Sequence, residues 1–116
     1  MKKVYHLSTC STCIRILKEL DLAAKGFELQ DIKTNKITPE QLDEMKELSG
    51  SYESLFSRRA MLYKSMGLAS KNLEENDYKN LILEHYTFLK RPVVVLNNEV
   101  FIGNSKKTVE AIASAL

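Results

Sequence analysis

The chain has 116 residues and a net charge of +2, with 44% hydrophobic and 28% charged residues. This composition is ordinary for a globular domain with one modest core, and so small a net charge gives no argument for direct binding to nucleic acid. No apolar stretch reaches the length of a membrane span, and the N-terminus lacks the apolar segment of an export signal. We therefore expect a single cytoplasmic domain with neither a membrane nor a nucleic acid as its partner.

The N-terminal part of the chain predicts a strand, a helix and a second strand. Residues 3–7 have the composition of a short strand, and residues 11–24 place apolar side chains at helical spacing, with Gly26 as the expected helix stop. Residues 27–32 then alternate apolar and polar side chains, as a half-exposed strand does. A strand–helix–strand unit of this kind makes two parallel strands.

The middle of the chain predicts helices. A capping box at residues 38–41, with a proline at the first helical position, begins the first of them. Residues 51–67 indicate a turn followed by a short helix that a glycine ends. A third helix is expected to begin at Asn72 or Asn76.

The C-terminal part predicts a hairpin followed by a helix. Residues 93–96 are a β-branched run suited to a buried strand, and residues 100–102 return as its antiparallel partner. Between them, Asn97 and Asn98 tolerate the positive φ of a tight turn. Ser105 is expected to cap a last amphipathic helix.

Without the middle segment, the order of elements is β-α-β-β-α, which is the order of the thioredoxin fold. The expected fold class is α/β: a thioredoxin-like fold with a mixed four-stranded sheet and an all-helical insert. Residues 1–36 and 91–116 are expected to form the core of this single domain, and about 37–90 the insert. Inserts of this kind usually carry specificity, because loops near the strand ends reach the site.

Both cysteines, Cys10 and Cys13, lie in a polar segment between the first strand and the first helix. Unpaired N–H groups at a helix N-terminus lower the pKa of a thiol placed there and can also hold an oxyanion. Ser11 and Thr12 separate the cysteines and are expected to contact a bound substrate. The pattern predicts a nucleophile, Cys10, followed one turn later by a thiol that can resolve a mixed disulfide.

These cysteines have two other interpretations, inert packing and a structural zinc site. Free cysteines are often buried and inert, although polar neighbours argue against that here. A structural zinc site needs four ligands, and beyond the cysteines the chain offers His6 and His85, which lie far apart in sequence. We therefore expect no metal and interpret His85 as structural. A Cys-x-x-Cys motif without an export signal is typical of cytoplasmic redox chemistry.

The sequence resembles the ArsC/Spx family, whose members have a thioredoxin fold with an all-helical insert. The resemblance covers nearly the whole chain. It rests on four places: Tyr5-His6 followed by Cys10, the turn at residues 56–60, the segment at residues 90–94, and the end of the hairpin at Gly103.

In the arsenate reductases of this family, the first cysteine of the loop attacks arsenate, a histidine four residues earlier supports it, and arginines hold the oxyanion. The resemblance also implies a cis proline beside the thiol loop, whose backbone pairs with a bound thiol or peptide. A further family arginine follows the hairpin, where this chain has Asn104. The expected catalytic residues are Cys10, Cys13, Arg91 and Arg59. The expected substrate-binding residues are His6, Ser11, Thr12, Arg58, Pro92 and Asn104.

The residues by themselves leave three of these roles open. Arg59 is also consistent with a surface arginine or a lid for the insert, Arg91 with a charge facing the carbonyls of a helix end, and His6 with a satisfied strand histidine. If they do bind an oxyanion, Arg59 and Arg91 can each hold it through two hydrogen bonds.

The resemblance implies two functions. The first is a thiol oxidoreductase that acts on an oxyanion such as arsenate, or on a disulfide. It would bind no cofactor and would use glutathione with glutaredoxin, or thioredoxin, as external reductant. The second is a Spx-like redox-switched regulator that binds the RNA polymerase α-subunit without turnover, since Spx proteins also carry a cysteine where this chain has Cys13. A thioredoxin-like binding module with vestigial cysteines is a third alternative.

Overall fold

The computed structural model describes residues 1–116, which divide into two compact units. The first unit contains residues 1–36 and 91–116, and the second contains residues 37–90. None of the helices in either unit combines the length and the apolar character that crossing a membrane requires.

The first unit is a four-stranded sheet with two helices. Its strands follow the order β2-β1-β3-β4, with β1 parallel to β2 and antiparallel to β3, and with β3 antiparallel to β4. The predicted mixed sheet and thioredoxin-like order of elements are therefore confirmed. The elements are β1 (Lys2–His6), α1 (Ser11–Glu19), β2 (Glu28–Asp31), β3 (Val93–Leu96), β4 (Glu99–Ile102) and α5 (Lys106–Ala115).

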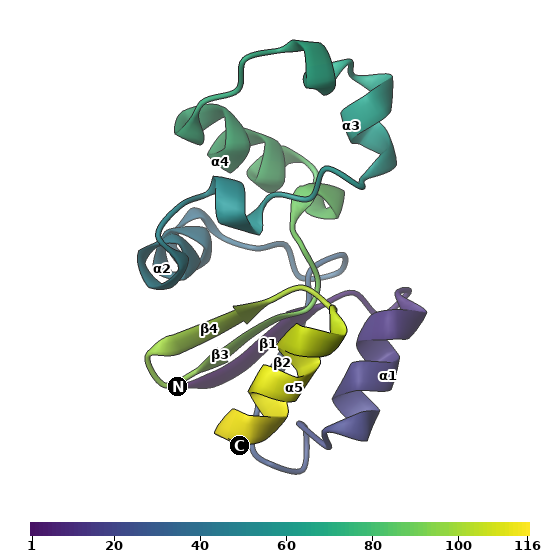
Figure 1. Cartoon of the computed structure of the whole chain (residues 1–116), viewed down its shortest axis with the longest axis vertical. Helices are drawn as coiled ribbons and strands as arrows, with labels where there is room; N and C mark the ends of the chain where they lie inside the picture. The colour runs from purple at the N-terminus through teal and green to yellow at the C-terminus, as the bar shows by residue number, and fades with distance from the viewer. The chain divides into compact units, whose positions relative to one another are not determined.

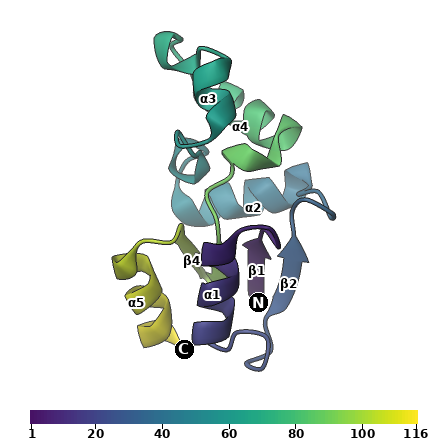
Figure 2. The same ribbon diagram turned by 90° about the vertical axis from the view of Figure 1, so that its right-hand side faces the viewer.

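Helices α1 and α5 lie side by side on one face of this sheet (Figures 1 and 2). All four residues of β3 are buried, as its unbroken apolar run predicts for a central strand. The apolar layer between helices and sheet consists of Val4, Leu22, Phe27, Val94, Leu96 and Ile112, with Leu17, Leu20 and Phe101 packed against it.

Helix α1 is shorter than the sequence predicts, because it ends at Glu19 and not at residue 24. Asp21 adopts a left-handed conformation with φ of 52°. The N–H of Leu22 donates to the Leu17 carbonyl at 3.1 Å, and the N–H of Asp21 donates to the Lys18 carbonyl at 3.1 Å. These two bonds form a Schellman motif. The expected stop at Gly26 was wrong because an aspartate takes the left-handed position that glycine usually occupies.

The hairpin and the last helix follow the prediction. Asn97, in the two-residue connection between β3 and β4, has φ of 56°. The Ser105 side chain accepts a hydrogen bond from the N–H of Thr108 at 3.1 Å and so caps α5.

The second unit is helical, as expected. Thr38 and Gln41 form the predicted capping box of the first helix, and Gly50 ends that helix with φ of 97°. The third helix begins at Glu75, one residue before the predicted start at Asn76, and Glu74 caps it in a reciprocal pair with Asp77. The elements are α2 (Pro39–Ser49), η1 (Glu53–Leu55), α3 (Met61–Ser65), η2 (Leu68–Ser70), α4 (Glu75–Glu84) and η3 (Tyr86–Phe88), where η marks a short 3₁₀ helix.

Phe56 lies at the centre of this helical unit and is fully buried. Its ring stacks on Phe88 at 4.9 Å between centroids and meets the edges of Tyr78 at 4.9 Å and Tyr63 at 6.0 Å. The backbone beside it pairs with a later segment, since the N–H of Ser57 donates to the Phe88 carbonyl at 2.7 Å. The unit thus has an aromatic core of its own.

Candidate functional site

Cys10 lies where the loop after β1 ends and helix α1 begins. It is the N-cap of α1, with φ of −94° and ψ of 107°, and its carbonyl accepts the first helical bond, from the N–H of Ile14 at 3.1 Å. The Cys10 N–H donates back to the Leu7 carbonyl at 2.9 Å and closes a tight turn. This geometry directs the free N–H groups of the first helical turn toward the Cys10 side chain.

The pKa of Cys10 lies below its ordinary value. Partial burial by itself would raise it, because burial disfavours the thiolate. Hydrogen bonds from the backbone N–H and the thiol of Cys13, the charge of Arg91, and the backbone N–H of Thr12 together outweigh that effect. The Cys10 thiol is half-buried and free. It is therefore both accessible and more ionised at neutral pH than an ordinary cysteine.

Cys13 has the opposite character. It is completely buried in the first turn of α1 and is also free. Burial, and then the hydrogen bond with Cys10, raise the pKa of Cys13 to about 12. Cys13 is consequently a protonated hydrogen-bond donor at neutral pH, and Cys10 is the nucleophile of the pair.

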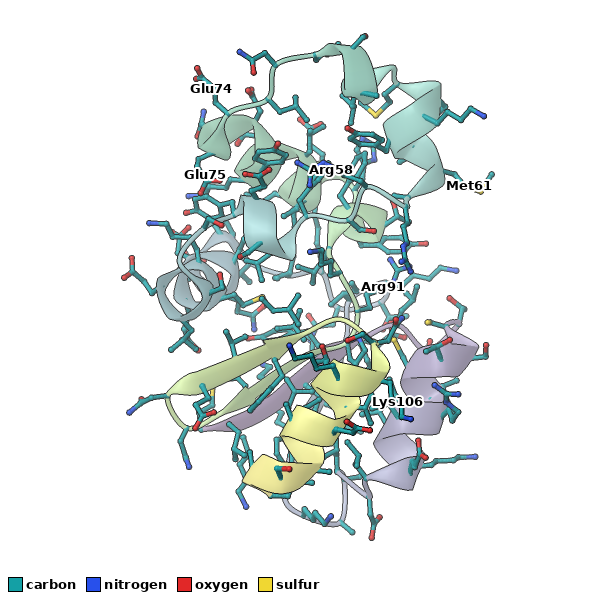
Figure 3. All side chains as sticks on the ribbon, viewed as in Figure 1. Arg58, Met61, Glu74, Glu75, Arg91 and Lys106 are labelled. Atoms are coloured by element: carbon teal, nitrogen blue, oxygen red, sulfur yellow. The ribbon has the colours of Figure 1, made fainter.

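Arg91 and Pro92 directly precede β3. Figure 3 shows Arg91 beside the N-terminal end of α1, and its charge lowers the pKa of both cysteines. The Arg91–Pro92 peptide bond is cis, and the buried Pro92 accepts a hydrogen bond on its carbonyl from the N–H of Gly103 at 2.9 Å. Arg91 is thus the predicted arginine that the structure places at the thiols.

His6 is the last residue of β1 and lies opposite Asp31 of β2 in the parallel pair. Its Nδ1 atom is buried without a hydrogen-bond partner. Burial lowers the pKa of His6, although the Asp31 charge opposes that shift. The lowered pKa keeps His6 mainly neutral at neutral pH, so it supplies no fixed positive charge.

Asp31 and Ser8 form a contact that the sequence interpretation missed. The Ser8 hydroxyl donates to Asp31 Oδ2 at 2.5 Å, and the Ser8 N–H donates to Asp31 Oδ1 at 3.4 Å. The Ser8 hydroxyl is the main cause of the lowered pKa of Asp31. Parallel strands bring their carboxyl ends to one edge of a sheet, so the pairing of residues 3–7 with 27–32 was the signal for it.

The remaining predicted residues of this unit lie at or just before the first turns of its two helices. Ser11 is exposed at the first position of α1, while Thr12 is half-buried and supplies its backbone N–H to Cys10. Asn104 is exposed immediately before the α5 cap. It carries no charge, so the positive field at the thiol in this unit comes from Arg91 and the N-terminus of α1.

Arg58 and Arg59 belong to the helical unit. The Arg58 guanidinium donates to the Glu53 carboxylate at 2.7 Å and to the Tyr78 hydroxyl at 3.0 Å, beside α4 (Figure 3). The bond to Glu53 is the main cause of the raised pKa of Arg58. Both arginines are exposed, but Arg58 is engaged by Glu53 and Tyr78 of its own unit.

A mixed sheet in the thioredoxin order, with an accessible thiol of lowered pKa at the N-terminus of its first helix, defines a thioredoxin-fold protein with a thiol site. The ArsC family model matches residues 5–112, and the chain belongs to the ArsC family. The predicted resemblance is thereby confirmed.

The relatives are of two kinds. The arsenate reductase of Neisseria meningitidis is 29% identical over 119 aligned residues, which cover 95% of this chain and 96% of that protein. The global transcriptional regulator Spx 2 of Bacillus anthracis is 24% identical over 105 residues, or 89% of this chain and 79% of the regulator. Among solved structures, the arsenate reductase of Vibrio cholerae superposes with a TM-score of 0.78 at 20% identity, covering 99% of this chain and 98% of that one, and shows the shared fold.

Proposed function

We propose that this protein is a thiol-dependent oxidoreductase of the arsenate-reductase type, with Cys10 as its nucleophile. The observation that carries the proposal is the asymmetry of the two thiols. Cys10 is accessible and has a lowered pKa, while Cys13 is buried and has a raised one. An inert pair of packed cysteines has no need for that difference.

In the first step, the Cys10 thiolate attacks the arsenic of arsenate. A sulfur–arsenic bond forms, and an arsenate oxygen leaves as water after protonation. Arg91 and the N–H groups of Thr12 and Cys13 favour the anionic thiolate and the bound oxyanion. Arg59, from the helical unit, is assigned by family resemblance to the same oxyanion.

In the second step, another thiolate attacks the Cys10 sulfur. A disulfide bond forms, and the electron pair of the sulfur–arsenic bond stays on arsenic, which is reduced from As(V) to As(III). An external thiol, such as glutathione with glutaredoxin, or thioredoxin, then reduces the disulfide. With a disulfide substrate, the Cys10 thiolate would attack one sulfur of the substrate. A mixed disulfide with Cys10 would form, and the other sulfur would leave as a thiolate.

Cys13 is suited to act only after Cys10 has reacted. Two causes of its raised pKa, the hydrogen bond with Cys10 and the Cys10 charge, disappear when Cys10 becomes bonded to another atom. Burial still raises the pKa of Cys13. Because the other two causes are gone, the Cys13 thiol nevertheless ionises more readily in the intermediate than in the resting protein. An external thiol and Cys13 are therefore alternative second nucleophiles.

A redox-switched regulator is the second candidate function. It is favoured by the Spx relatives, by the second cysteine one turn after the first, and by the absence of charge at Asn104. In this case the Cys10–Cys13 disulfide would be the signal. The partner would be the RNA polymerase α-subunit, which Spx proteins bind.

The experiment compares turnover of arsenate with either reductant in the wild type, Cys10→Ser and Cys13→Ser. For a reductase we expect no detectable turnover in Cys10→Ser and partial turnover in Cys13→Ser, because an external thiol can replace Cys13. Wild-type protein that forms the Cys10–Cys13 disulfide and captures the polymerase α-subunit when oxidised, but never turns over, is a regulator. Ordinary, slow thiols would contradict both functions and leave the vestigial binding module.

A further inference from the structure

The carboxylate of Asp31 ties the loop that carries the nucleophile to the neighbouring strand. Asp31 is the last residue of β2, and both of its oxygens accept hydrogen bonds from Ser8, at 2.5 Å from the hydroxyl and 3.4 Å from the N–H. The N–H of Lys33 donates to Oδ1 at 3.1 Å and orients the carboxylate. The carbonyl of Asp31 also accepts the N–H of Asn35 at 2.8 Å, which fixes its backbone.

The loop needs such an anchor because its own residues specify its conformation only weakly. The turn runs from Leu7 to Cys10, closed by the bond from the Cys10 N–H to the Leu7 carbonyl at 2.9 Å. Its two central residues are Ser8 and Thr9, neither of which is a glycine or a proline that would preset a turn dihedral. Both are exposed, so burial does not hold them either.

We propose that Asp31 is a positioning residue for Cys10, which it holds at the N-cap of α1 through Ser8. The inference rests on the proposed thiol chemistry, because it concerns the reactivity of the same sulfur. In this arrangement the carboxylate fixes Ser8, Ser8 fixes the turn, and the turn fixes the Cys10 backbone at which its sulfur meets the N–H groups of Thr12 and Cys13. Asp31 itself touches neither cysteine in this scheme.

A positioning role and a purely electrostatic role of Asp31 predict opposite changes in the reaction rate of Cys10. Cys10 is influenced by Cys13 and Arg91, and Asp31 by His6 across the strand pair. If Asp31 acted on Cys10 only through its negative charge, its removal would favour the thiolate and speed the reaction of Cys10. If Asp31 positions Cys10, its removal takes the sulfur away from the N–H groups and slows that reaction.

The test measures the alkylation rate of Cys10 by iodoacetamide against pH, with the modified residue identified by mass spectrometry. The variants are Asp31→Asn, Ser8→Ala and Ser8→Thr, which keeps the hydroxyl. Asp43→Asn is the matched control, because the Asp43 carboxylate also accepts a hydroxyl at 2.5 Å, from Tyr52 within the helical unit. Thermal unfolding of every variant is measured alongside.

We expect Asp31→Asn and Ser8→Ala to shift the Cys10 profile to higher pH, with alkylation below the wild-type midpoint slower by up to about tenfold, the factor of one pKa unit. Ser8→Thr should restore the wild-type rate, and Asp43→Asn should match wild type even where both aspartate variants unfold at a lower temperature. Should Asp31→Asn fail to fold, the pair Ser8→Ala and Ser8→Thr gives the same comparison without any change of charge.

Faster alkylation in Asp31→Asn, or rates in Ser8→Ala equal to wild type, would overturn the positioning role. These outcomes are separate from the proposed function. Slowed alkylation in a protein that never turns over arsenate keeps the positioning role and removes the reductase. Turnover that persists with unchanged alkylation in the variants keeps the reductase and removes the positioning role.

Discussion

The two units of this protein use their polar groups in different ways. In the sheet unit, the N–H groups at the start of α1 and the charge of Arg91 act on Cys10, which is accessible. In the helical unit, polar side chains bond to other groups of the same unit: Asp43 accepts the Tyr52 hydroxyl at 2.5 Å and pairs with Lys79 at 3.0 Å. The reactivity of the thiol therefore has local causes within the sheet unit.

The carboxylate of Glu75 extends this pattern in the helical unit. It accepts the N–H of Tyr52 at 2.8 Å and the N–H of Glu53 at 3.1 Å, and so caps the 3₁₀ turn η1 from helix α4. Arg58 is bound to Glu53 in turn. Charged side chains that look available for a substrate in the sequence thus help to hold short helices together. Arg58 and Arg59 are both exposed, but Arg58 is engaged by Glu53.

The largest effect is expected from damage to the aromatic core of the helical unit. Phe56→Ala removes a completely buried ring that contacts three other aromatic rings, and we expect it to lower the free energy of unfolding by about 3–5 kcal/mol. Hydrogen exchange should show the loss mainly in residues 37–90, because the ring's contacts lie there.

The same Phe56→Ala variant should keep the lowered pKa of Cys10, measured by alkylation against pH at a temperature where the sheet unit is folded. The matched control is Val94→Ala, which empties a buried position of the sheet unit's own core and should weaken exchange protection in that unit. A return of the Cys10 pKa to its ordinary value in Phe56→Ala would show that the helical unit helps to lower it.

The fold was largely predictable because its signals are local and periodic. Residues 93–96 are the strand that the β-branched run predicts, and Thr38 and Ser105 cap the helices that they were expected to cap. Three features escaped prediction. Asp21 and Glu74 take positions that other residue types usually occupy, and the 3₁₀ helices η1, η2 and η3 span three residues each, too few to show a period.

The candidate site was predictable where its residues are close in sequence. Cys10 and Cys13 were found because the strand, the loop and the helix that place them are consecutive in sequence. The contact between Ser8 and Asp31 joins positions 23 apart, so it depends on the register of β1 against β2. The opposite shifts of the two thiol pKa values depend on burial, hydrogen bonds and the Arg91 charge, which a Cys-x-x-Cys motif alone does not specify.

An arginine of the sheet unit and an arginine of the helical unit should differ in their effect on the Cys10 thiol. Arg91→Ala should raise the pKa of Cys10, because the Arg91 charge is among the causes that lower it. Since the thiolate is the reactive form, the alkylation profile moves to higher pH, and the rate at neutral pH falls by about threefold to tenfold, within one pKa unit.

Arg91→Lys keeps the charge and should retain most of the wild-type rate, whereas Arg59→Ala should leave the alkylation profile of the substrate-free protein unchanged. Any role of Arg59 toward an oxyanion would then appear as a raised KM for arsenate with an unchanged alkylation profile. Equal shifts of the profile in Arg91→Ala and Arg59→Ala would contradict the assignment of the thiol's field to the sheet unit.

The smallest effect is expected at the far end of α1. Asp21 holds a left-handed conformation and places a negative charge at the C-terminus of the helix, and both are unfavourable for an aspartate. Asp21→Gly should therefore raise the free energy of unfolding by about 0.5–1 kcal/mol, since relief of both costs exceeds the greater flexibility of glycine in the unfolded chain. Asp21→Asn, which removes only the charge, should gain about half as much. Denaturant unfolding measures both, and the alkylation rate of Cys10 should stay constant, because the N–H groups that serve the thiol lie in the first turn of the helix. A destabilised Asp21→Gly would mean that the aspartate side chain, and not the left-handed backbone, ends the helix.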